Sequence, residues 1–267
     1  MRTNSTAPAS TTTAADGPFT AIARALFRLF YVPYVLALLL VLIVFAALLA
    51  LLLPSLHARR VSTRWLARIW LAVAFLRLRI EGLEHLPAGS CVLVANHASY
   101  LDGVVMKAAL PPRFSFVIKR EASSMPVVGL LLRRIGSEFV DRHSAGGRHR
   151  DARRVMARAG QGHSLVFFPE GTFDSVVGLK RFHIGAFVAA ARGGMPLVPS
   201  VIHGARRSMP NGAIAPHPGV IRVEILPAID STDRDSDELR DIARGVILER
   251  VGEPDLAELA HAPNRAR

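Results

Sequence analysis

An unbroken run of 19 apolar residues near the amino terminus, Val35 to Leu53, is the strongest constraint on what this chain can fold into. A helix from Tyr31 to the end of that run would be roughly 34 Å long, about the hydrocarbon thickness of a bilayer plus a little tilt. Tyr31 and Tyr34 at its start suit a membrane interface. The run is also too long for the apolar part of a signal peptide. We therefore predict a membrane-anchoring helix, with a buried core helix as the alternative.

Arginines flank the apolar run on both sides, and their imbalance predicts its orientation. Two precede it and four follow it: Arg24 and Arg28, then Arg59, Arg60, Arg64 and Arg68. Because positive charge is enriched on the cytoplasmic side of membrane helices, we expect the carboxyl-terminal portion in the cytoplasm. A second apolar stretch, Trp65 to Ile80, contains three arginines. It is interpreted as an interfacial helix, or as the second arm of a re-entrant hairpin with the first.

The composition excludes several classes of protein. Hydrophobic residues make up 51% of the chain and charged residues 20%, which is too apolar for a disordered protein. The net charge of +12 comes mostly from arginine, a side chain that favours phosphate and carboxylate partners. The arginine-rich segment 133–158 is interpreted as a solvated helix face, a surface for anionic lipid or a contact for an acidic carrier protein, and no nucleic-acid motif accompanies it. The single cysteine, Cys91, excludes a disulfide framework and a cysteine-based zinc site, and we predict no metal site.

Beyond Glu81, short apolar runs alternate with amphipathic stretches, which is the pattern of an α/β fold. We predict a mostly parallel sheet flanked by helices and preceded by the N-terminal membrane helix or helical hairpin. The expected strands are Val92–Ala95, Phe114–Ile118, Glu138–Val140, Leu165–Phe168, Leu197–Val201 and Ile221–Leu226. The expected helices are 101–110, 124–134, 147–159, 180–192 and 235–250. The predicted organisation is a disordered tail (1–17), an anchoring region (18–80), an α/β domain (81–252) and a C-terminal tail (253–267).

A histidine follows the first expected strand of that domain, and an aspartate follows the histidine five positions later: His97 and Asp102. Five residues is a poor spacing for one helix face, so we expect the histidine in the strand-to-helix turn and the aspartate in the first helical turn. The carboxylate would then bind one imidazole nitrogen and leave the other as a base for an incoming hydroxyl. A satisfied turn histidine is the alternative.

A second polar turn follows the expected strand Leu165–Phe168, with the sequence Pro169-Glu170-Gly171-Thr172. Proline ends the strand ladder, and glycine allows the backbone to approach a ligand closely. Exposed amides in such a turn can hold an anion or a developing oxyanion. An ordinary turn is the alternative.

Together these two stretches resemble the glycerolipid acyltransferase family, which includes the 1-acylglycerol-3-phosphate O-acyltransferases. Two further blocks agree in order and spacing. One runs from Lys119-Arg120-Glu121 to Phe139-Val140-Asp141-Arg142, and the other is Val198-Pro199-Ser200-Val201. The resemblance covers about residues 80–230, together with an apolar N-terminal region that is common in the family.

The resemblance implies a role for each matching residue. His97 would be the general base and Asp102 its orienting partner, while the substrate would be bound by Asn96, Lys119, Arg142, Glu170, Gly171 and Thr172. It implies transfer of a fatty acyl group from acyl-CoA or acyl carrier protein, as co-substrate, to lysophosphatidic acid, with no bound cofactor. The absence of a Gly-x-Ser-x-Gly motif agrees with direct transfer. The expected location is a bacterial inner membrane, with the catalytic domain in the cytoplasm.

One position departs from the family pattern, because Phe173 stands where the family usually has a phosphate-binding arginine. This departure leaves the acceptor open. Lys180, Arg181 or Arg206 could compensate, or the acceptor could be another lysolipid or a lyso-aminolipid. A non-catalytic membrane module that binds anionic lipid is the remaining alternative.

Overall fold

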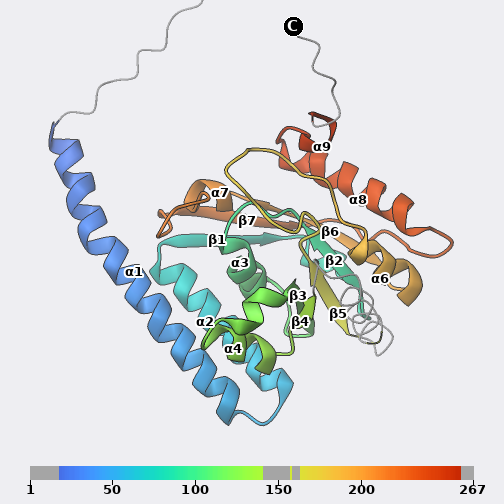
Figure 1. Ribbon diagram of the computed structural model, residues 1–267, viewed down its shortest axis with the longest axis horizontal. Coiled ribbons are helices and arrows are strands. Elements are labelled where there is room, and N and C mark those ends of the chain that lie inside the picture. The colour runs from blue at the N-terminus through green and yellow to red at the C-terminus, as the bar shows by residue number, and fades with distance from the viewer. Residues whose placement is uncertain (1–17, 141–156, 158–162, 260–267) are drawn as a thin grey trace, which may run out of the picture.

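The computed structural model describes residues 18–140, 157 and 163–259, and its centre is one seven-stranded sheet (Figure 1). The strands are β1 (Leu76–Glu81), β2 (Val92–Ala95), β3 (Phe114–Lys119), β4 (Glu138–Val140), β5 (Ser164–Phe167), β6 (Leu197–His203) and β7 (Gly219–Ile225). Their order across the sheet is β1-β7-β6-β2-β5-β3-β4. Every neighbouring pair is parallel except β6 and β7, so the predicted mostly parallel α/β sheet is confirmed.

Helices cover both faces of the sheet, and the pleat of β2 explains why. Leu93 and Ala95 point into the core on the side of α2 (Leu56–Val73) and α3 (Leu101–Ala109). Val92 and Val94 point into the opposite core, under α6 (Gly185–Gly193) and α8 (Ser236–Val251) (Figure 1). Successive side chains of a strand face opposite ways, and all four of these are fully buried. A continuous apolar run therefore fits a central strand.

The remaining helices are short, apart from the first. They are α1 (Pro18–Leu52), α4 (Val128–Arg134), α7 (Ala205–Ser208) and α9 (Leu256–Leu259), with 3₁₀ turns at Leu83–His85 and Arg120–Ser124. Within α1, residues Ala25–Leu52 are long and apolar enough to cross a membrane, so the predicted apolar helix is confirmed.

Helices α1 and α2 form a hairpin that packs on the α/β domain (Figure 1). Tyr31 donates its hydroxyl hydrogen to the carbonyl of Ala74, 2.8 Å away, and both Tyr31 and Val35 belong to the main core. At the other end of α1, the guanidinium of Arg134 donates to the last carbonyls of the helix. Tyr34 is exposed, whereas Tyr31 is buried against the domain.

The prediction of one helix over Trp65–Ile80 is wrong in its second half. Helix α2 ends at Val73, and Leu76–Glu81 forms β1 at the edge of the sheet. The sequence Leu-Arg-Leu-Arg-Ile-Glu alternates with period two, so its leucines and isoleucine face the core while its charged residues are exposed. Phe75, with φ of +55°, makes the break between helix and strand. The sheet thus begins inside the range assigned to the anchoring region.

Other element predictions agree in type and differ in their boundaries. The helix expected over 180–192 begins only at Gly185, and the one expected over 124–134 begins only at Val128, after a 3₁₀ turn that ends at Ser124. Within the predicted C-terminal tail, Asp255 forms a bridge with Leu179. The expected tail 1–17 and nearly all of the expected helix 147–159 lie outside the described residues.

Candidate active site

The two polar turns predicted from the sequence lie side by side at the centre of the sheet. They follow β2 and β5, which are parallel neighbours, so both turns emerge from the same edge. The carboxyl edge of an open parallel sheet is where ligands bind in α/β folds.

His97 and Asp102 make the predicted contact. His97 Nδ1 lies 2.8 Å from Asp102 Oδ2, and that oxygen also accepts the backbone N–H groups of Ala98 and Ser99 at 2.7 and 2.8 Å. The carboxylate is fully buried in the first turn of α3. Because a carboxylate only accepts hydrogen bonds, Nδ1 carries the proton and Nε2 is left as the basic nitrogen.

Glu170 connects the two turns. One carboxylate oxygen accepts the backbone N–H of His97 at 2.6 Å, and the other accepts the backbone N–H of Lys180 at 2.9 Å. The side chain is buried, and burial raises the pKa of Glu170 to about 7, against the opposing effect of those two N–H groups. Its carboxylate therefore holds the backbone beneath the histidine.

Asn96, the residue after β2, likewise binds backbone groups, in its case those of the neighbouring strand β6. Its side-chain amide donates to the carbonyl of Ile202 and accepts the N–H of the same residue, at 3.1 and 2.7 Å. The side chain is buried. Both polar atoms of this predicted binding residue therefore hold the end of β2 to β6.

Aromatic rings surround the imidazole of His97. Phe168 stacks on it with ring centroids 4.5 Å apart, and Phe173 meets it edge-on at 4.8 Å. Tyr100 in turn meets Phe173 edge-on at 4.6 Å. Sequence reasoning missed Phe168 and Tyr100. Their position next to the two turns was a signal that could have identified them.

The cations proposed to bind a phosphate are placed differently from one another. Lys119 ends β3 and is half-buried, while Arg142 lies outside the described residues. Lys180 forms an ion pair with Asp174 and donates to the carbonyl of Thr172. Arg206 forms an ion pair with Glu253 at 3.2 Å and donates to the carbonyl of Val176 at 3.0 Å. Arg181 is exposed. Two of the three candidates to replace an arginine at position 173 are thus engaged within the chain.

The segment after Glu170 is held by residues 253–256, which we name the C-terminal strap. Leu179 pairs with the strap on both sides, donating to Pro254 at 2.9 Å and accepting from Leu256 at 3.0 Å. Arg244 of α8 binds the carboxylate of Asp255 through two hydrogen bonds, at 2.6 and 2.8 Å. The strap therefore fixes the backbone one residue before the Lys180 N–H that binds Glu170.

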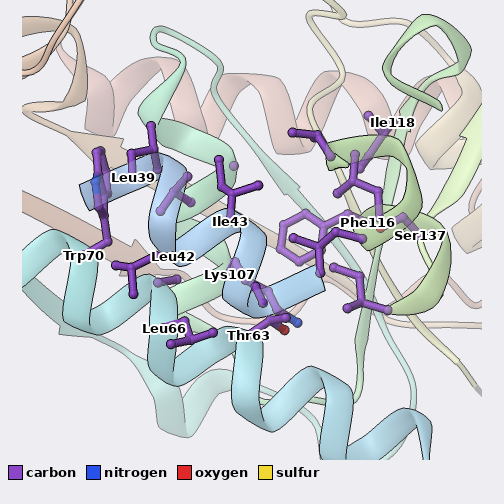
Figure 2. Close-up of a pocket in the computed structure, with 18 of the residues that line it drawn as sticks. Leu39, Leu42, Ile43, Thr63, Leu66, Trp70, Lys107, Phe116, Ile118 and Ser137 are labelled. Atoms are coloured by element: carbon purple, nitrogen blue, oxygen red, sulfur yellow. The ribbon is translucent and has the colours of Figure 1, made fainter. Parts of the chain in front are cut away.

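An apolar pocket of about 390 Å³ lies next to this site (Figure 2). Residues of α1, α2, α3, α4 and β3 line it, among them Leu42, Trp70 and Phe116. Lys107 is one of its few polar residues, and burial lowers the pKa of Lys107 to about 7 with help from the charges of Arg60 and Arg64. Tyr100 also lines the pocket, and it contacts Phe173, which in turn contacts the imidazole of His97.

The comparisons with known proteins agree with this arrangement. The family model described as Acyltransferase matches residues 77–203, which include both turns. Individual proteins similar to this chain indicate which kind of acyltransferase it resembles. One is 1-acyl-sn-glycerol-3-phosphate acyltransferase BAT2, chloroplastic, of Brassica napus, 33% identical over 72% of this chain and 57% of that protein. Another is the 1-acyl-sn-glycerol-3-phosphate acyltransferase of Pseudomonas aeruginosa, 31% identical over 62% of this chain and 63% of that protein. The chain thus spans about three fifths of the length of these relatives.

A solved structure has the same fold. The 1-acyl-sn-glycerophosphate (LPA) acyltransferase PlsC from Thermotoga maritima matches with a TM-score of 0.74, over 91% of this chain and all of that one, at 22% identity. The match includes the helical hairpin as well as the sheet, because it extends well beyond residues 77–203.

Proposed function

We propose that the chain is a membrane-bound 1-acyl-sn-glycerol-3-phosphate acyltransferase. It would move a fatty acyl group from a thioester of coenzyme A or acyl carrier protein to the free hydroxyl of lysophosphatidic acid, giving phosphatidic acid. The observation that carries the proposal is the His97–Asp102 pair at the carboxyl edge of the sheet, with Nδ1 held at 2.8 Å and Nε2 left as the base.

The mechanism is direct transfer with one base. Nε2 of His97 takes the proton of the acceptor hydroxyl as its oxygen attacks the thioester carbonyl carbon. The C–S bond then breaks, and the leaving thiolate takes the proton from the imidazolium. The buried Asp102 carboxylate stabilises that imidazolium. General-base assistance of this kind typically contributes about 10²- to 10⁴-fold.

The apolar pocket supports a lipid substrate. A fatty acyl chain needs a space lined by apolar side chains, and this pocket provides one (Figure 2). Ring contacts through Tyr100 and Phe173 connect its lining to the imidazole of His97. The acceptor phosphate would be met by Lys119 and Arg142, with the turn Gly171–Thr172 shaping the same space.

The surface of the helical hairpin supports membrane attachment. Leu40, Val41 and Leu52 of α1 are each more than 60% exposed on the side facing away from the domain. We place the domain on the cytoplasmic side of a bacterial inner membrane, because four arginines closely follow the apolar run and only two precede it.

A second candidate function keeps the chemistry and changes the acceptor. It is favoured by Phe173, an apolar ring where the family usually has an arginine, and by the internal ion pairs of Lys180 and Arg206. Another lysophospholipid or a lyso-aminolipid would then accept the acyl group.

The test uses membranes that contain the wild-type protein, His97→Ala, or the exposed control His217→Ala. Each is given lysophosphatidic acid with a long-chain acyl-CoA or acyl carrier protein thioester, and phosphatidic acid is measured. We expect product with the wild type and the control, and a loss of at least ~100-fold in His97→Ala. Product with lysophosphatidylcholine or a lyso-aminolipid alone would favour the second candidate. Salt-sensitive binding to anionic vesicles without turnover would indicate a non-catalytic module.

A further inference from the structure

The imidazole of His97 has apolar neighbours on the sides not occupied by Asp102. Phe168 covers one ring face and Phe173 lies edge-on to the ring, with centroids 4.5 and 4.8 Å away. Only 19% of the histidine side chain is exposed. The imidazole is therefore mostly shielded from solvent, and Phe173 forms one wall beside it.

Phe173 is itself held in place from two directions. Tyr100 meets it edge-on at 4.6 Å, from the turn that precedes α3. Its own backbone segment is fixed by Lys180, which pairs with Asp174 and donates to the carbonyl of Thr172 at 3.3 Å. Such contacts on both neighbours of Phe173 restrain its position over the histidine.

Tyr100 connects this wall to the apolar pocket. It is one of the residues that line the pocket, on the same side as Gly103 and Val104 of α3. The pair Tyr100–Phe173, which we name the aromatic gate, therefore forms a chain of ring contacts from the pocket to the imidazole of His97.

Water is the competing acceptor at any base-activated thioester. Its oxygen would attack the thioester carbonyl carbon while His97 Nε2 takes a proton from it. The C–S bond would break, and the thiolate would take that proton to give a fatty acid and a free thiol. An aromatic edge offers water no strong hydrogen bond, whereas an arginine at the same place would carry water with it. Exclusion of water is a recognised way for an active site to prevent hydrolysis of a reactive group.

We propose that the aromatic gate determines specificity against water, keeping the thioester for the lipid hydroxyl. The inference rests on the proposed acyltransferase activity and adds to it the residues that separate transfer from hydrolysis. Phe173 is the principal residue, because it touches the histidine, and Tyr100 supports it.

The experiment measures thiol release from a long-chain acyl-CoA without any acceptor, and phosphatidic acid formation with lysophosphatidic acid. The full-length protein in detergent micelles is compared with Phe173→Ala, Phe173→Leu and the double variant His97→Ala/Phe173→Ala. Val176→Ala is the matched control, since Val176 is an exposed apolar residue of the same segment.

We expect Phe173→Ala to raise thiol release without acceptor about tenfold and to lower the ratio of transfer to hydrolysis by at least that factor. Phe173→Leu should fall between it and the wild type, which covers the case in which the alanine variant folds poorly. Val176→Ala should match the wild type, and the double variant should lose the added hydrolysis.

Several results would overturn the gate. They are unchanged hydrolysis in both Phe173 variants, a parallel fall of hydrolysis and transfer, or added hydrolysis that persists without His97. The proposed function is tested by a different readout: it fails if the wild type makes no acylated lipid. Thiol release without an acceptor would still test the gate in that case.

Discussion

The two segments that flank His97 are held in opposite ways. Residues 96–102 form a short turn whose main support, the Asp102 carboxylate, lies within the turn itself and binds three of its groups. Residues 168–181 form a long irregular segment supported from far along the chain, by Arg206, Arg244 and the C-terminal strap. Glu170 joins the two segments by hydrogen bonds, since its carboxylate accepts the backbone N–H groups of His97 and Lys180.

This difference separates the rigid part of the site from its adjustable part. A turn that closes on itself fixes the base and its tautomer with few residues. The longer segment carries Phe173, and its position depends on contacts whose loss would leave the base intact. Substitutions in the two segments should therefore affect different quantities.

The largest effect is expected from Asp102→Asn. The variant replaces the oxygen acceptor that fixes His97, so the imidazole can adopt the wrong tautomer. We expect transfer to fall by about 10³- to 10⁴-fold, as removal of an orienting carboxylate does elsewhere. The free energy of unfolding should fall by about 1–3 kcal/mol, because two backbone N–H groups also lose a charged partner. Initial rates and thermal melts measure both, and a loss below tenfold would contradict the assigned role.

A smaller effect is expected from Glu170→Gln, which weakens the connection between the segments. The amide can accept only one of the two backbone N–H groups, so we expect about a tenfold loss of transfer. The pKa of Glu170 is about 7 in the folded protein and near its usual 4.5 when unfolded. The folded state therefore binds the extra proton between these values, and stability should fall by up to about 3 kcal/mol as the pH rises from 4.5 to 7.

The pH dependence of stability tests whether Glu170 is the group that takes up this proton. Melting temperatures of the wild type and Glu170→Gln are compared from pH 5 to pH 8. The wild type should lose stability relative to the variant as the pH rises through this window, because glutamine does not titrate. Parallel curves for the two proteins would mean that another group causes the change.

The smallest effect is expected from Asp255→Asn, which loosens the strap at the far end of the longer segment. The pKa of Asp255 is lowered to about 2, chiefly by its hydrogen bonds from Arg244, so it is ionised at neutral pH. We expect a loss of about 1 kcal/mol in stability and a severalfold rise in the KM for the lipid acceptor, with kcat nearly unchanged. Glu258→Gln, in the neighbouring α9, is the matched control. An equal effect on kcat and KM would remove the distinction between the segments.

The sequence predicted features that depend on neighbouring residues better than features that depend on contacts between distant parts of the chain. The strands of the central sheet and the contact between His97 and Asp102 depend on patterns within ten residues, and these predictions are confirmed. The edge strand β1 was missed because it follows an apolar helix with no proline or glycine between them. Its alternation was the correct signal.

The longer segment could not be predicted for a physical reason. Glu170 binds backbone N–H groups 73 positions before it and 10 after it, and backbone groups leave no trace in side-chain patterns. The strap pairs with Leu179 from 75 positions away, mostly through backbone atoms, so its order was not visible in a polar C-terminal stretch. The aromatic neighbours of His97 likewise depend on how two turns face each other across the sheet.

The buried Tyr31 has a practical consequence for anyone handling the protein. Tyr31 and Val35 are part of the same core as β2 and α3, and Arg134 is fastened to the end of the same helix. A chain beginning after Leu53 would therefore lose core residues and expose the apolar surfaces of α2 and α4 to water. We therefore expect removal of the first helix to lower the stability of the α/β domain itself, because the helix supplies part of the domain's core.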